Sequence, residues 1–193
     1  ETEKNLTLTI EMTKKTGLAG ALITGFINLG ALHYEMGRYQ EAQESYNDAL
    51  VVLEQVGYNP SLPRVVQMLK VAAGIRGGFE LKLDGFLNFD LPTIRMKRIK
   101  GMAAQAMGEC YLYIDESHKD EAETWIKKAI EIDEQNRMPW DLARDYALYA
   151  EFFKKKGDPT KAKEKLSKAI DLMTSIGADG WVERYEKELA ELK

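Results

Sequence analysis

Residues 28–53 read NLGALHYEMGRYQEAQESYNDALVVL, and this stretch decides the fold. A helix is predicted on each side of Gly37, because a residue without a Cβ readily takes the left-handed conformation at a helix C-terminus. After Gly37, apolar residues recur at three- and four-residue steps, which is the spacing of one helix face. Small residues such as Gly30 and Ala42 would let two helices approach, and Tyr46 would fill the gap beside them. The stretch therefore predicts a helical hairpin.

The hairpin recurs along the chain with a period of forty residues, and several sets of similar residues share that spacing. Two sets are glycines: Gly17, Gly57 and Gly177, and Gly37, Gly77 and Gly157. Two are alanines: Ala42, Ala122 and Ala162, and Ala49, Ala129 and Ala169. A fifth set holds the large residues Tyr46, Phe86, Ile126 and Leu166. Because independent sets share one period, we predict a repeat protein whose units pack mainly on their neighbours.

The hairpin resembles the tetratricopeptide repeat, whose pattern combines Leu-Gly, Tyr, Gly-x-Tyr, Ala, Tyr/Phe and Ala. The matching residues are Leu29, Gly30, Gly37, Tyr39, Ala42, Tyr46 and Ala49. His33 stands in a slot where tyrosine is usual. The resemblance implies an all-α fold, a right-handed α-α superhelix of about four hairpins closed by a C-terminal capping helix.

The repeats predict a single domain over 1–193. Residues 1–16 would be the second helix of a truncated repeat, the full repeats would span 17–56, 57–96, 97–136 and 137–176, and 177–193 would form the cap. The second repeat is degenerate, because Gly85 and Pro92 interrupt its second helix, which is expected to be short over 79–89. The third repeat is expected to begin its first helix near Thr93. The half-hairpin at the N-terminal end indicates a fragment of a larger protein.

Composition argues against several classes of protein. Lys and Arg number 27 against 31 Asp and Glu, and the net charge of −4 is too acidic for a general nucleic-acid binder. The single Cys110 excludes an internal disulfide and fits a reducing compartment, so a cytoplasmic location is expected. No apolar run approaches the length that spans a membrane.

Residues that could carry chemistry are few. His33 is expected to have a core or interface role rather than a ligand role, because polar-tipped residues often occupy such half-buried positions. The candidate ligands for a metal site are Glu109, Cys110, Asp115, Glu116 and His118. However, zinc sites need several convergent nitrogen or sulfur ligands, and most of these residues would lie in a solvated turn. The glycines of 74–78 lack the Gly-Lys-Ser/Thr ending of a phosphate loop. We therefore predict no enzymatic activity, no cofactor and no metal.

The resemblance also implies a binding site. In tetratricopeptide proteins the concave wall is lined by the second, fifth, ninth and twelfth positions of each first helix. The corresponding candidate groove residues are Thr24, Ile27, Tyr34, Arg64, Gln67, Gln105, Glu109, Arg144 and Glu151. Many of them could instead pack against a neighbouring repeat. The basic run Arg95–Lys100 is either a solvated face or a site for an acidic partner.

Two functions remain open. The first is a non-catalytic protein–protein interaction scaffold, which holds a peptide, a protein domain or another domain of the parent chain in its groove. Neither nucleic acid nor a membrane is expected as a partner. The second is a regulatory, ligand-sensing domain. Residues 140–189, from WDLARDYALYA to VERYEKEL, resemble the C-terminal repeats of predicted signal-transduction ATPases and adenylate/guanylate cyclases.

Overall fold

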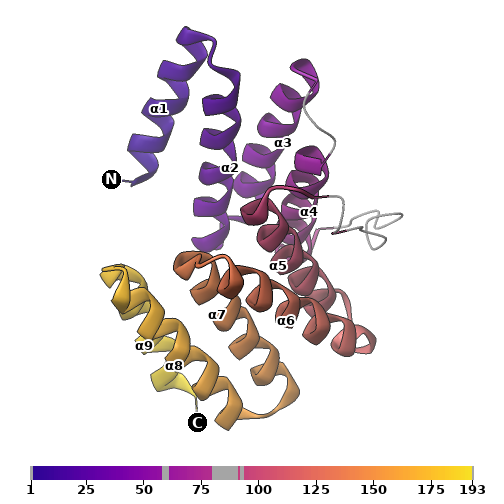
Figure 1. Ribbon diagram of the computed structural model, residues 1–193, viewed down its shortest axis with the longest axis vertical. Coiled ribbons are helices and arrows are strands. Elements are labelled where there is room, and N and C mark those ends of the chain that lie inside the picture. The colour runs from indigo at the N-terminus through magenta and orange to yellow at the C-terminus, as the bar shows by residue number, and fades with distance from the viewer. Residues whose placement is uncertain (1, 58–60, 80–90, 92–93, 193) are drawn as a thin grey trace. The chain divides into compact units, whose positions relative to one another are not determined.

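The computed structural model describes residues 2–57, 61–79, 91 and 94–192 (Figure 1). All regular secondary structure in this part of the chain is helical, so the prediction of an all-α fold is confirmed. Contacts between residues divide the chain into two compact units, residues 1–89 and 90–193. We call them unit 1 and unit 2.

Unit 1 contains α1 (Thr2–Thr16), α2 (Ala19–Glu35), α3 (Tyr39–Gln55) and α4 (Ser61–Arg76), and each helix packs on the next. The predicted hairpin is α2 with α3. Ala42 and Ala49 are fully buried where these helices approach, and Tyr46 and Leu53 fill the space around them. The short second helix expected over 79–89 lies, except for Phe79, outside the described residues.

Unit 2 contains α5 (Lys97–Ile114), the short 3-10 helix η2 (Glu116–His118), α6 (Lys119–Gln135), α7 (Pro139–Lys156), α8 (Pro159–Ser175) and α9 (Asp179–Glu191). The hairpins are α5 with α6 and α7 with α8, and α6 also packs on α7. α5 begins at Lys97, later than predicted, because a turn precedes it in which the Ile94 nitrogen donates to the Leu91 carbonyl at 3.1 Å.

The predicted apolar stripe of the C-terminal helix is confirmed. Tyr185 is 4% exposed, and Trp181, Leu189 and Leu192 are partly buried beside it. These residues pack on the cluster that α7 and α8 form between them, which includes Leu166. α9 therefore covers an apolar face that the last hairpin would otherwise expose.

The turn between α6 and α7 joins the two hairpins of unit 2, and it has an arginine where the corresponding turns have a glycine. Gly17 before α2 and Gly177 before α9 have φ angles of 68° and 70°, and Arg137 has a φ of 55°. The Met138 nitrogen then donates to the Asp133 carbonyl at 3.0 Å, which closes the turn. A side chain in the left-handed region costs roughly 1–2 kcal/mol.

Replacing Arg137 by glycine should therefore raise the free energy of unfolding by about 0.5–1 kcal/mol, since part of the relief is offset by the greater chain entropy of glycine. Urea unfolding of the two proteins measures the difference. Lys128→Gly, at an exposed position inside α6, is the matched control and should lower stability instead. A loss of stability in Arg137→Gly would show that the contacts of the arginine side chain stabilise the protein by more than its backbone strain destabilises it.

Candidate functional site

The two faces of α7 contact different helices of unit 2. On one face, the Tyr149 hydroxyl donates to Glu123 Oε1 of α6 at 2.9 Å, and Lys156 Nζ lies 3.5 Å from Glu123 Oε2. On another face, Glu151 accepts a hydrogen bond from the Tyr113 hydroxyl of α5. The first helices of the two hairpins are therefore joined directly, on a face of α7 other than the one that meets α6.

α9 continues this arrangement. Glu188 lies on α9, where Arg184 Nε is 3.3 Å from its Oε1. Burial raises the pKa of the Glu188 carboxyl, and the negative charge of Glu151 raises it further, while Arg184 and Lys154 oppose the shift. Glu151 and Lys154 of α7 thus act on α9. We call the side of α5, α7 and α9 that carries Glu109, Arg144, Glu151 and Glu188 the unit 2 wall.

The predicted groove residues of unit 2 differ in how much surface they offer. Glu109, Arg144 and Glu151 are partly exposed. Gln105 is only 8% exposed, so its amide has little surface to offer a partner. Glu151 is held by Tyr113, and the charge of Arg144 reaches two buried aspartates beside it. The structure brings Glu151 of α7 to α5 and α9, as a shared wall requires.

In unit 1 the candidate residues divide by chemistry. Ile27 and Tyr34 of α2 are partly buried and pack against the core of that unit. Thr24 is exposed, and its hydroxyl donates to the Gly20 carbonyl at 2.9 Å. On α4, Arg64 is exposed and Gln67 is partly exposed. The apolar candidates therefore help to build unit 1, and the polar ones remain accessible.

His33 is buried, as predicted, with 8% of its surface exposed. Its Nε2 lies 3.1 Å from Glu3 Oε1, and its Nδ1 lies 3.3 Å from Ser45 Oγ. The Ser45 hydroxyl also donates to the Glu41 carbonyl at 2.9 Å. The imidazole thus links α1 to the hairpin of α2 and α3, in the slot where tyrosine is usual.

The residues considered for a metal site have local roles. Cys110 is 4% exposed, and burial raises the pKa of its thiol. His118 Nδ1 lies 2.8 Å from Asp115 Oδ1. Hydrogen bonds from Ser117 and His118 lower the pKa of Asp115 to about 2. Within the described parts of the chain, no three side chains of His, Cys, Asp or Glu come together as metal ligands would.

The glycine cluster at 74–78 is a helix end. The Phe79 nitrogen donates to the Gly74 carbonyl at 2.9 Å, and Gly78 has a φ of 70°. This is the geometry of a helix C-terminus, and the helix that would follow it in a repeat turn lies outside the described residues.

Sequence reasoning missed one polar feature. Asp133 of α6 and Asp145 of α7 are each only 1% exposed. The sequence did contain a signal of this buried aspartate, because Asp133 occupies the same position of the forty-residue repeat as Leu53 and Met173. Those two residues are 1% and 0% exposed in their own hairpins. An aspartate in an apolar series is the kind of exception that marks a buried polar site.

Comparison with known families agrees with this architecture. The model of the tetratricopeptide repeat family matches residues 24–50, in α2 and α3, and residues 111–136, from the end of α5 through α6. None of the curated proteins compared with the chain matches it. In the described segments, no helix has both the length and the apolar character to cross a membrane. Tetratricopeptide repeats generally mediate protein–protein interactions and are typically non-catalytic. The chain therefore carries two segments that match the tetratricopeptide repeat family, one in each unit.

Proposed function

We propose that the protein is a scaffold that binds an extended segment of a partner protein on its first helices. The observation that carries this proposal is the hydrogen bond from Tyr113 to Glu151, because it joins α5 to α7 on a face of α7 other than the one bound to α6. Side chains from successive hairpins then lie along one surface. An extended segment can be held there by a few polar contacts and side-chain pockets.

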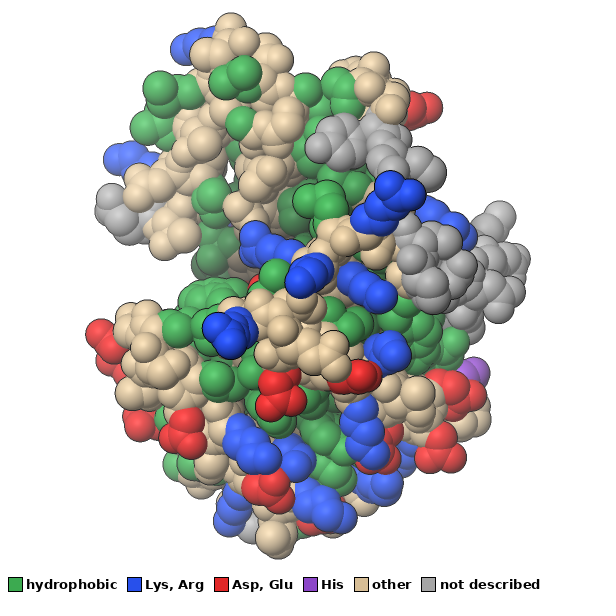
Figure 2. All heavy atoms as spheres, viewed as in Figure 1, with side chains coloured by type: hydrophobic (Ala, Val, Ile, Leu, Met, Phe, Trp, Pro, Cys, Tyr) green, Lys and Arg blue, Asp and Glu red, His purple; other side chains and the backbone are tan. Residues whose placement is uncertain are grey.

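The charge of the unit 2 wall favours a partner with both acidic and basic side chains. Glu109, Glu151 and Glu188 are acidic, and Arg144 and Arg184 are basic. Figure 2 shows the same mixture over the face of unit 2 that it draws, with red and blue side chains next to one another. Alternating charge selects a partner by its charge pattern and opposes a polyanion such as nucleic acid.

Unit 1 supplies its own candidate contacts, Arg64 and Gln67 on α4. Arg64 is exposed, and neither residue belongs to the apolar core of unit 1. We propose that these polar side chains also contact the partner. The contribution of each unit can be measured separately, because each has a charged residue whose reversal leaves the core intact.

Charge reversal tests the proposal. Glu109→Lys in unit 2 and Arg64→Glu in unit 1 should each weaken binding of a partner isolated with the full chain. A residue at a binding hot spot contributes about 2 kcal/mol or more, which corresponds to roughly a thirtyfold rise in Kd. Calorimetric titration of the purified partner measures that change. Arg144 is not chosen, because its charge acts on the buried aspartates beside it.

The matched controls are Glu134→Lys on α6 and Lys163→Glu on α8, which are exposed positions on second helices. They make the same changes of charge away from the first helices and should leave Kd within a factor of two or so. If all four variants bind the partner equally well, the first helices are not the binding surface. Circular dichroism confirms that each variant is folded.

A further inference from the structure

Two aspartates face each other inside unit 2. The carboxyl groups of Asp133 on α6 and Asp145 on α7 lie within hydrogen-bonding reach of each other. Asp133 also packs against the backbone of α5, since a Cβ added at Gly101 would lie 2.1 Å from its Oδ1. Three helices from two hairpins therefore meet at this pair of carboxyl groups.

The pair lacks hydrogen-bond donors. Asp133 Oδ1 and both side-chain oxygens of Asp145 have no partner among the described residues. Two ionised carboxylates are acceptors only, so they cannot satisfy each other. One proton between them supplies a donor and removes one of two buried negative charges, and carboxyl groups that share a site retain a proton for this reason.

The charged groups acting on the pair come from α5 and α7. Arg98 of α5 lies with its Nε 3.6 Å from Asp141 Oδ2 of α7. Burial raises the pKa of Asp133 to about 6, and Asp141 adds to the rise while Arg144 and Arg98 oppose it. Burial and the charge of Asp133 also raise the pKa of Asp145 well above its ordinary value. The arginines therefore offset only part of the rise in pKa that burial causes.

We propose that Asp133 and Asp145 form a proton-dependent latch that holds the hairpin of α7 and α8 on the hairpin of α5 and α6. With the proton in place, α6 and α7 stay packed around the pair. When the proton leaves for solvent, two negative charges face each other in the interior and the hairpins separate locally. The contact between Tyr113 and Glu151 joins the same two hairpins, so an open latch also disrupts the unit 2 wall.

The fold itself does not require this pair. Leu53 and Met173 occupy the position of Asp133 in other hairpins and are buried there. An apolar side chain would therefore satisfy the packing of the helix. The acidic pair adds a dependence on pH that a leucine or methionine would not give.

The direction of that dependence follows from the raised pKa values. The folded pair binds more protons than the unfolded chain, so its stabilising contribution is complete below about pH 4. The contribution is lost as pH rises through about 6, the folded pKa of Asp133, and further as Asp145 ionises. The latch therefore weakens from acidic to alkaline pH.

Hydrogen exchange of the full chain tests the latch, with rates corrected for the intrinsic effect of pH. Between pH 5 and pH 8.5, the opening equilibrium of the amides in α6 and α7 should rise at least about tenfold, because about one unit of the pKa shift of Asp133 lies above pH 5. Amides of α2 and α3 in unit 1 should not show this rise. Asp145→Asn keeps the shape and supplies a donor, so it should abolish the rise.

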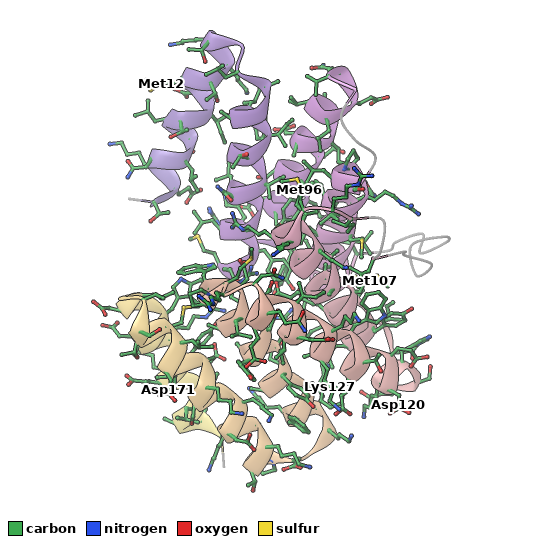
Figure 3. The ribbon with its side chains drawn as sticks, viewed as in Figure 1. Met12, Met96, Met107, Asp120, Lys127 and Asp171 are labelled. Atoms are coloured by element: carbon green, nitrogen blue, oxygen red, sulfur yellow. The ribbon has the colours of Figure 1, made fainter. Side chains whose placement is uncertain are left out.

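Asp171→Asn is the control, because Asp171 is exposed on α8 and lies at the surface of unit 2 (Figure 3). It should keep the full pH dependence of the wild type. The double variant Asp133→Leu with Asp145→Val removes both carboxyl groups and provides a second test if Asp145→Asn does not fold, and it should also abolish the rise. The latch is wrong if wild type shows no rise, or if Asp145→Asn or the double variant rises as wild type does.

Discussion

Removing residues 179–193 is expected to lower the free energy of unfolding of unit 2 by about 4 kcal/mol or more. Tyr185 is almost fully buried, and Trp181 and Leu189 pack beside it on the apolar cluster of α7 and α8. Burying one large apolar side chain contributes roughly 1.5–3 kcal/mol, and truncation removes several at once. Urea unfolding followed by circular dichroism measures the loss.

Truncation should also change the oligomeric state of the chain in solution. The apolar face of α7 and α8 would become exposed, and such patches promote association. Sedimentation of the truncated chain should show oligomers or aggregates. Glu183→Ala and Lys187→Ala alter exposed positions of α9 and should change neither property. A truncated chain that is equally stable and monomeric would show that α9 is not a cap.

Replacing Gly30 by leucine should cost about 3 kcal/mol of stability, at the upper end of the usual range for overpacking. A Cβ at Gly30 would lie 2.6 Å from Tyr46 Cε1, closer than real side-chain atoms approach. The Tyr46 ring is 2% exposed, so it has little room to move away. Thermal unfolding and urea unfolding should both report the loss.

Gly20→Leu is the matched control within the same helix. A Cβ at Gly20 meets nothing within 4 Å. Leucine is a better helix former than glycine, so this variant should gain roughly 0.5 kcal/mol. Equal effects of the two substitutions would mean that α2 and α3 do not approach at Gly30, and the hairpin geometry would have to be revised.

The sequence was sufficient to predict the packing within the hairpins of α2 with α3, α5 with α6 and α7 with α8. Ala42, Ala122 and Ala162 lie at forty-residue spacing, and all three are fully buried. The reason is that a close helix crossing admits only a small side chain, and a repeat protein makes the same crossing in each unit. A packing constraint that recurs from repeat to repeat can therefore be recognised from the sequence alone.

Features that depend on two separated helices were not predicted. The pairing of Asp133 with Asp145 needs α6 and α7 to place both carboxyl groups at one point, which no single periodic pattern describes. Arg137 was missed for a related reason. Its left-handed backbone is imposed by the turn that joins the two hairpins of unit 2, although arginine does not favour that conformation.

The candidate groove stays a prediction. Family resemblance gave positions on the first helices, and Glu151 does contact another first helix through Tyr113. The resemblance did not say how much surface each side chain keeps. Ile27 packs on the core of unit 1, and Gln105 is 8% exposed, because a residue beside a helix crossing can be covered by its neighbours.

Photo-crosslinking with a purified partner tests the binding surface most directly. A photoreactive side chain is placed either at Glu109, on the unit 2 wall, or at Thr124, an exposed position of α6. Position 109 should give efficient crosslinks and position 124 few, and the crosslinked peptides should come from one extended segment of the partner. Crosslinks that come mainly from position 124, or equally from both, would contradict binding on the first helices.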